Sequence, residues 1–250
     1  MIAYWMMEWS WYPALVVLLG YMVFGLTGFG SALVIIPLLS WKWPLGLIVP
    51  TVLLLDVLAS ISHTGMNWHQ VRWRVVPKVL PFAVFGAWLG SHLHQWSDGS
   101  WAIAALGLYI CWVALRGLRG RSDTVKKSSI LFNAIAGTLM GLIETLFGTA
   151  GPVVMAWLHR QEHDTENIRA TAPLVILMMV CIALLSNGLS THSDMNQVFA
   201  KTLWLTPFAL LGGWCGQKMS SLIQPAHATK VIYSVLLASG IGLTMRTVLI

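Results

Sequence analysis

Long apolar runs separated by short polar segments predict a series of membrane-spanning helices. The first run, residues 12–40, is interrupted by Gly28-Phe29-Gly30-Ser31. Because one crossing needs about 20 apolar residues, this run predicts either a strong kink or a hairpin of two helices. Further apolar runs cover residues 45–62, 75–93, 101–115, 130–158, 170–186, 201–218 and 229–249.

The run over residues 130–158 contains a second interruption, Gly148-Thr149-Ala150-Gly151-Pro152, which lies 120 residues after the first. Hydrocarbon cannot hydrogen-bond to exposed backbone, so a helix break at membrane depth must be buried in protein or line a cavity. Each break precedes an apolar stretch, and Pro152 suits the first position of a helix. Two helix N-termini, which attract anions, are therefore predicted to face one cavity.

A second pair of similar segments supports an internal duplication. Residues 81–90, PFAVFGAWLG, match residues 207–216, PFALLGGWCG, at six of ten positions with an offset of 126. We predict two repeats, residues 1–122 and 123–250, each a broken-helix hairpin followed by three transmembrane helices. The shared Gly-x-x-x-Gly indicates close helix packing and allows a homodimer without requiring one.

The positions of basic residues favour inverted repeats. If each broken segment is a hairpin that returns to its own side, twelve of the 15 Lys and Arg residues fall on the inner side of the membrane. Only Lys42, Lys201 and Arg246 then lie outside, together with both termini. If each broken segment crosses once, the split is ten to five, which satisfies the positive-inside rule less well.

Composition places the chain in a cell membrane. Hydrophobic residues make up 57% and charged residues 10% of the 250 residues, and the mean hydropathy is +0.73, far above a soluble domain. The net charge of +6 comes from short loops, so nucleic-acid binding is not expected. The three cysteines fall in apolar runs and are interpreted as small core residues. No cleaved leader, cofactor or metal is expected.

The residues at the two breaks are the candidate substrate site. Their glycines can line the substrate or only pack helices, and their hydroxyls can donate to an oxyanion or cap local backbone. The candidate substrate-binding residues are Thr27, Gly28, Phe29, Gly30, Ser31, Thr145, Gly148, Thr149, Ala150 and Gly151.

Two acidic residues within apolar runs are candidates for coupling or gating. Glu144 precedes the second break by one turn, and Asp56 lies in the helix after the first. Charges at membrane depth are expensive and usually functional. Beside an anion, Glu144 would have to be protonated or paired with a donor such as a backbone N–H. Both acids could instead make structural hydrogen bonds, or bind the ion of a cation or metal permease.

A metallopeptidase pattern is also present. His159-Arg160-Gln161-Glu162-His163 matches His-x-x-Glu-His, in which two histidines bind zinc and the glutamate is the base. The match falls in a short polar loop with no folded domain around it. We therefore do not expect an intramembrane enzyme at this position.

At its breaks the chain resembles the sulfite exporter TauE/SafE family of membrane permeases. In that family each half carries a Gly-rich segment that leads into a short apolar run with Pro or Leu. The corresponding segments here are Gly28-Phe29-Gly30-Ser31 with Pro37-Leu38-Leu39, and Gly148-Thr149-Ala150-Gly151-Pro152 with Leu158.

The resemblance implies transport of a small sulfur-containing anion such as sulfite or an organosulfonate, usually outward across a prokaryotic cytoplasmic membrane. The sequence departs from the fuller glycine clusters of the family at Ser31-Ala32 and Thr149-Ala150. We expect a secondary transporter that works by alternating access, with the anion held between the two breaks.

Overall fold

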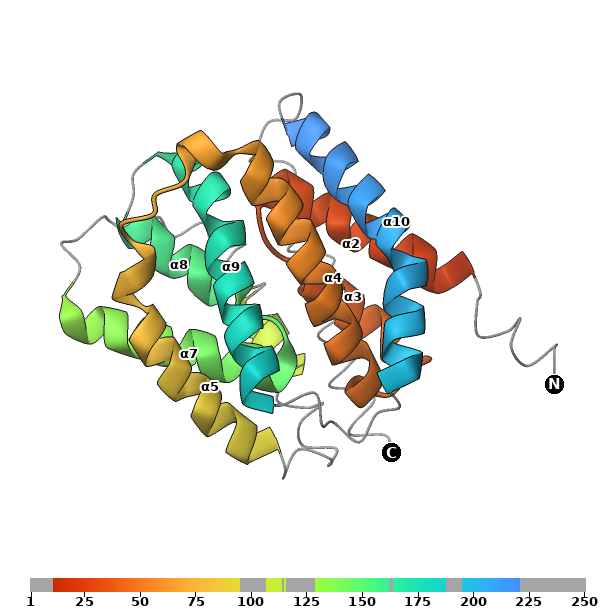
Figure 1. Cartoon of the computed structure of the whole chain (residues 1–250), viewed down its shortest axis with the longest axis horizontal. Helices are drawn as coiled ribbons and strands as arrows, with labels where there is room; N and C mark the ends of the chain where they lie inside the picture. Colours follow the sequence, from red (N-terminus) through yellow and green to blue (C-terminus); the bar gives the residue numbers. More distant parts are fainter. Residues whose placement is uncertain are drawn as a thin grey trace.

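The computed structural model describes residues 11–94, 107–113, 115, 129–161, 164–187 and 195–220, and every regular element in these ranges is a helix (Figure 1). Residues 107–113 are helical, and two 3-10 turns, η1 (Trp68–Gln70) and η2 (Val76–Lys78), follow α4. The α-helices are α2 (Trp11–Thr27), α3 (Ser31–Leu39), α4 (Leu45–Met66), α5 (Leu80–His94), α7 (Ile130–Phe147), α8 (Gly151–Gln161), α9 (Thr165–Asn187) and α10 (Met195–Ser220).

Four of these helices, α4, α7, α9 and α10, are long and apolar enough to cross a membrane, and α2 and α5 are shorter apolar helices. The prediction of an all-α polytopic membrane protein is therefore confirmed. The predicted crossing over residues 229–249, residues 101–106 and 114 of the one over 101–115, and the basic segment over 116–128 lie outside the described residues.

Each broken segment is a hairpin of two helices. The Tyr12 hydroxyl at the start of α2 donates to the Leu38 carbonyl near the end of α3, at 2.8 Å. In the second segment, Trp157 Nε1 near the end of α8 donates to Asn133 Oδ1 near the start of α7, at 2.9 Å. Both pairs join the first turn of one helix to the last two turns of the next, so the second helix runs back along the first and the alternative of a kinked single helix is wrong.

The glycines explain why the helices end where they do. Gly28, Gly30 and Gly148 have φ angles of 81°, 94° and 64°, in the left-handed region that glycine adopts without steric penalty. The amides of Gly28 and Gly148 close the last turns of α2 and α7 by donating to the carbonyls of Phe24 and Glu144, at 2.7 and 2.8 Å.

The long arm of each hairpin packs most extensively against a helix from the other part of the chain: α2 against α10, and α7 against α5 (Figure 1). A Cβ atom added to Gly86 would lie 2.0 Å from the Thr138 carbonyl oxygen, and one added to Gly216 would lie 2.1 Å from that of Met22. The Gly-x-x-x-Gly faces are thus covered within the chain, which confirms close helix packing. They give no argument for a homodimer, which stays a prediction.

Helices α4 and α9 lie side by side at the centre (Figure 1). Helix α4 also contacts α3 and α10, and α9 also contacts α5, α7 and α8. Large side chains such as Phe24, Ile36 and Trp157 are almost completely buried in this core. The two central helices therefore form the wall against which both hairpin tips rest.

Candidate functional site

The tips of the two hairpins contact one another. A Cβ atom added to Gly151 would lie 3.1 Å from Phe29 Cδ2 and 3.6 Å from the Gly30 nitrogen, and one added to Gly148 would lie 3.7 Å from Ile36 Cδ1. The N-termini of α3 and α8 are therefore neighbours, although they are 120 residues apart in the chain.

A small cavity lies between the tips. About 10 Å³ of it is open to the centre of a water-sized molecule, which is room for about one water. Six of the ten predicted binding residues line it. The lining consists of Gly30, Ser31, Ala32, Leu33, Asp56, Glu144, Gly148, Thr149, Ala150, Gly151 and Ile176.

At the first tip, α3 begins without a side-chain cap: its N-cap residue is Gly30. The Ser31 hydroxyl, in the first turn, donates to Asp56 Oδ1 at 2.8 Å. The Tyr21 hydroxyl donates to the same oxygen at 2.7 Å. Asp56, in the middle of α4, is only 3% exposed, so this carboxyl group joins α2, α3 and α4 beside the cavity.

At the second tip, a carboxyl group occupies the start of α8. Glu144 Oε2 accepts a hydrogen bond from the Ala150 amide at 2.7 Å. Glu144 is 1% exposed, and its Oε1 makes no hydrogen bond to any described residue; the same holds for Thr149 Oγ1. The Tyr109 hydroxyl donates to the Thr149 carbonyl at 3.1 Å. This tip thus carries two buried polar atoms with unused hydrogen-bonding capacity.

Four predicted binding residues do not line the cavity. Thr27 Oγ1 donates to the backbone, with the carbonyls of Val23 and Phe29 at 2.8 and 2.7 Å. Gly28 rests against the backbone of Arg169, Phe29 packs on Gly151, and Thr145 is fully buried.

The sequence interpretation missed Arg169, which lies in the second turn of α9. Its guanidinium group donates to the Leu26 carbonyl at the end of α2, where the helix dipole favours a positive charge. The internal duplication gives a signal for this position. Val49 lies 120 residues before Arg169, and it lies next to Gly148 at the second break as Arg169 lies next to Gly28 at the first. Tyr21 and Tyr109 were also missed, since an aromatic residue in an apolar run gives no signal of its own.

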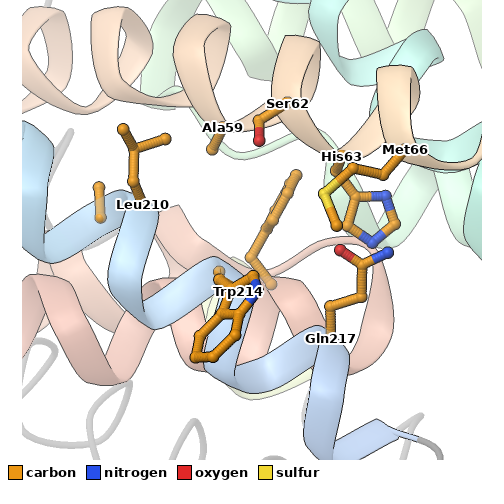
Figure 2. A pocket seen from close by; sticks show the side chains of 10 residues that line it. Ala59, Ser62, His63, Met66, Leu210, Trp214 and Gln217 are labelled. Carbon is orange, nitrogen blue, oxygen red and sulfur yellow. The ribbon is translucent and has the colours of Figure 1, made fainter.

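A second, larger cavity lies among α2, α4 and α10, with about 50 Å³ on the same measure. Figure 2 shows His63 and Gln217 pointing toward one another across it. Ser60 and Thr64 are buried on α4 close to His63, and their hydroxyls make no hydrogen bond to any described residue. The lining consists of Phe24, Ala59, Ser62, His63, Met66, Ala209, Leu210, Gly213, Trp214 and Gln217.

The histidine motif gives no metal site in the part of the chain that the structure describes. His159 Nδ1 lies 2.8 Å from the Met155 carbonyl on an exposed face of α8, while Glu162 and His163 lie outside that part. Among the described residues, no three His, Cys, Asp or Glu side chains are placed to hold a metal ion.

Comparison with known proteins identifies the family. The model of the sulfite exporter TauE/SafE family matches residues 13–243. The chain is 35% identical over 195 residues to the probable inner membrane transporter protein TsaS of Comamonas testosteroni, covering 78% of this chain and 82% of the relative. It is 21% identical over 228 residues to the probable sulfite/organosulfonate exporter TauE of Cupriavidus necator, covering 89% and 88%. No solved structure matches.

The family match covers nearly the whole helical chain, and the relative from Comamonas testosteroni aligns over most of its own length. The apolar helices agree with a protein that works within a membrane. The chain belongs to the sulfite exporter TauE/SafE family, a family of membrane transporters and not of enzymes.

Proposed function

We propose that this protein is a secondary transporter of the inner (cytoplasmic) membrane that exports a small sulfur-containing anion such as sulfite or an organosulfonate. The observation that carries the proposal is the meeting of the α3 and α8 N-termini at one buried cavity. The printed names of the two relatives, an inner membrane transporter and a sulfite/organosulfonate exporter, support it.

The chemistry of the tips suits a small oxyanion. The first amides of a helix have no partner within the helix, and the dipole makes that end positive. The Thr149 hydroxyl, which makes no hydrogen bond to any described residue, adds a donor, whereas the Ser31 hydroxyl already donates to Asp56. No Lys or Arg lines the cavity, so the anion is held by neutral donors and can be released again.

Transport requires the tips to separate. A cavity with room for about one water cannot admit an anion of four or more heavy atoms. We propose that one hairpin moves relative to the α4 and α9 wall, and that the cavity opens alternately to the two sides of the membrane.

We further propose that the repeats are inverted, with residues 1–122 and 123–250 as the two halves. The crossed packing of α2 on α10 and α7 on α5 supports the division into two related halves. The placement of basic residues supports the inversion: Lys42 and Lys201 lie over the rings of Tyr12 and Trp43 near the start of α2. At the opposite end, Lys78 donates to Gln161 at 3.4 Å.

A cation or metal permease is the second candidate, because Asp56 and Glu144 line the same cavity. The substitution Glu144→Gln separates the two functions. An anion transporter should bind its substrate at least as well after loss of the carboxylate, whereas a cation carrier should lose binding.

The deciding experiment is flux into proteoliposomes with a panel of sulfite, sulfoacetate, sulfate and chloride, at two clamped membrane potentials. The matched variants are Gly151→Ala, whose Cβ would press on Phe29 at 3.1 Å, and Gly65→Ala, whose Cβ would meet no atom within 4 Å. We expect Gly151→Ala to lower sulfite or sulfoacetate flux at least tenfold and Gly65→Ala to leave it unchanged. Equal flux in both variants, or no anion transport by the unmodified protein, would refute the proposal.

A further inference from the structure

We propose that the Glu144 carboxylate is a tethered competitor of the transported anion, and that one proton bound by Glu144 travels with each anion. The inference rests on the proposed anion transport at the hairpin tips. It assigns this protein a further activity, proton transport, and assigns the proton to one side chain.

At the start of α8, the Glu144 carboxylate occupies a hydrogen-bond donor that the anion needs. Glu144 Oε2 accepts from the Ala150 amide at 2.7 Å, and this amide is at the helix N-terminus where an anion would bind. An N–H group donates one strong hydrogen bond, so the carboxylate and the anion exclude each other there. In the closed structure, the position of the anion is therefore filled by an oxygen of the protein itself.

The negative charge of Glu144 also opposes the entry of an anion into the cavity. An anion entering the cavity would join Glu144 and Asp56 in a buried space with no Lys or Arg among its lining residues. Like charges repel strongly where water is excluded. A proton on Glu144 removes one negative charge, frees the Ala150 amide and provides an O–H that can donate to the anion.

The surroundings distinguish Glu144 from Asp56. Asp56 Oδ1 already accepts the hydroxyl protons of Tyr21 and Ser31, whereas Glu144 Oε1 has no hydrogen-bond partner in the described part of the chain. The other titratable group beside Glu144 is Tyr109, whose hydroxyl donates to the Thr149 carbonyl. The described residues that α3, α8 and α9 bring to the cavity are not ionisable.

The proposed step is balanced. On one side of the membrane the Glu144 carboxylate takes up one proton, releases the Ala150 amide, and the anion binds that amide. On the other side the anion leaves, the proton leaves, and the carboxylate returns to the amide. One proton and one anion move in the same direction, so the net charge moved is one smaller in magnitude than the charge of the anion.

The test is the accumulation of labelled sulfoacetate in proteoliposomes at equilibrium, with clamped membrane potentials and a pH dye inside. Sulfoacetate carries two negative charges at neutral pH. With a coupled proton, its accumulation ratio should change about tenfold for each 60 mV; without one, it should change about a hundredfold. We expect the tenfold dependence and a matching proton flux in the unmodified protein.

The substitution Glu144→Gln keeps an oxygen that can accept from the Ala150 amide and removes the titratable proton. We expect this variant to show the hundredfold dependence with no proton flux. The matched control is Glu166→Gln, at an exposed acid in the first turn of α9, which should behave as the unmodified protein does.

The outcomes separate the two proposals. If no anion of the panel crosses the membrane, the proposed function fails and the coupling fails with it. If the unmodified protein transports sulfoacetate with the hundredfold dependence and no proton flux, the coupling alone is wrong. The same conclusion follows if Glu144→Gln keeps the proton flux. Should this variant not fold, the potential dependence and proton flux of the unmodified protein still decide.

Discussion

The closest helix contact of the fold predicts a large difference between two glycine-to-alanine substitutions. In Gly86→Ala, the added Cβ would lie 2.0 Å from the Thr138 carbonyl oxygen and 2.8 Å from the Thr138 Cα. An ordinary contact is at least 3.4 Å, so α5 and α7 would have to separate by more than 1 Å. Overpacking of this kind costs about 1–3 kcal/mol.

Gly65→Ala provides the matched control on another helix. The added methyl group at Gly65 meets no atom within 4 Å, and alanine favours a helix over glycine by about 0.5–1 kcal/mol. The free energy of unfolding should therefore differ between the variants by about 1.5–4 kcal/mol.

Thermal unfolding in detergent measures this difference. One kcal/mol shifts the melting temperature of a chain of this size by about 2–4 °C, so Gly86→Ala should melt several degrees below the unmodified protein and Gly65→Ala at or above it. If both variants have the same melting temperature, α5 and α7 are not in direct backbone contact, and the packing argument for the two Gly-x-x-x-Gly faces is wrong.

Two further stability predictions concern buried polar groups. Trp157→Phe removes the 2.9 Å hydrogen bond to Asn133 Oδ1, which still accepts from Gln161, and should lower the free energy of unfolding by about 0.5–1.5 kcal/mol; an unchanged melting temperature would contradict this. Thr64→Val replaces a buried hydroxyl that has no hydrogen-bond partner among the described residues with a group of the same shape, and should leave stability unchanged or raise it by about 1 kcal/mol. A clear loss in the same assay would mean that the hydroxyl is hydrated or paired.

The sequence was sufficient to locate the helix breaks, because glycine and proline act on the backbone wherever the chain folds. It left the choice between kink and hairpin open, since that choice depends on contacts such as Tyr12 with Leu38. The meeting of the two breaks could be predicted only by analogy with other transporters. The structure supplies the contact between Phe29 and Gly151 directly.

Side-chain roles at the site were harder to predict than its position. Thr27 and Thr149 both flank a break, but Thr27 donates to its own backbone while Thr149 lines the cavity. The difference depends on the side-chain rotamers of the two threonines, which the pattern of residues along the chain does not determine. Arg169 lies directly before the apolar run over residues 170–186 and gives no signal there, because its contact with the Leu26 carbonyl joins segments 143 residues apart.

The crossed packing of the hairpins has a consequence for biosynthesis. Helix α2 is among the first segments to leave the ribosome, but its main packing partner, α10, is made about 170 residues later. During that interval the face of α2 that packs on the glycines of α10 has only lipid or a chaperone to cover it. Co-expressed halves of this protein should therefore protect each other from proteolysis, and either half alone should be degraded.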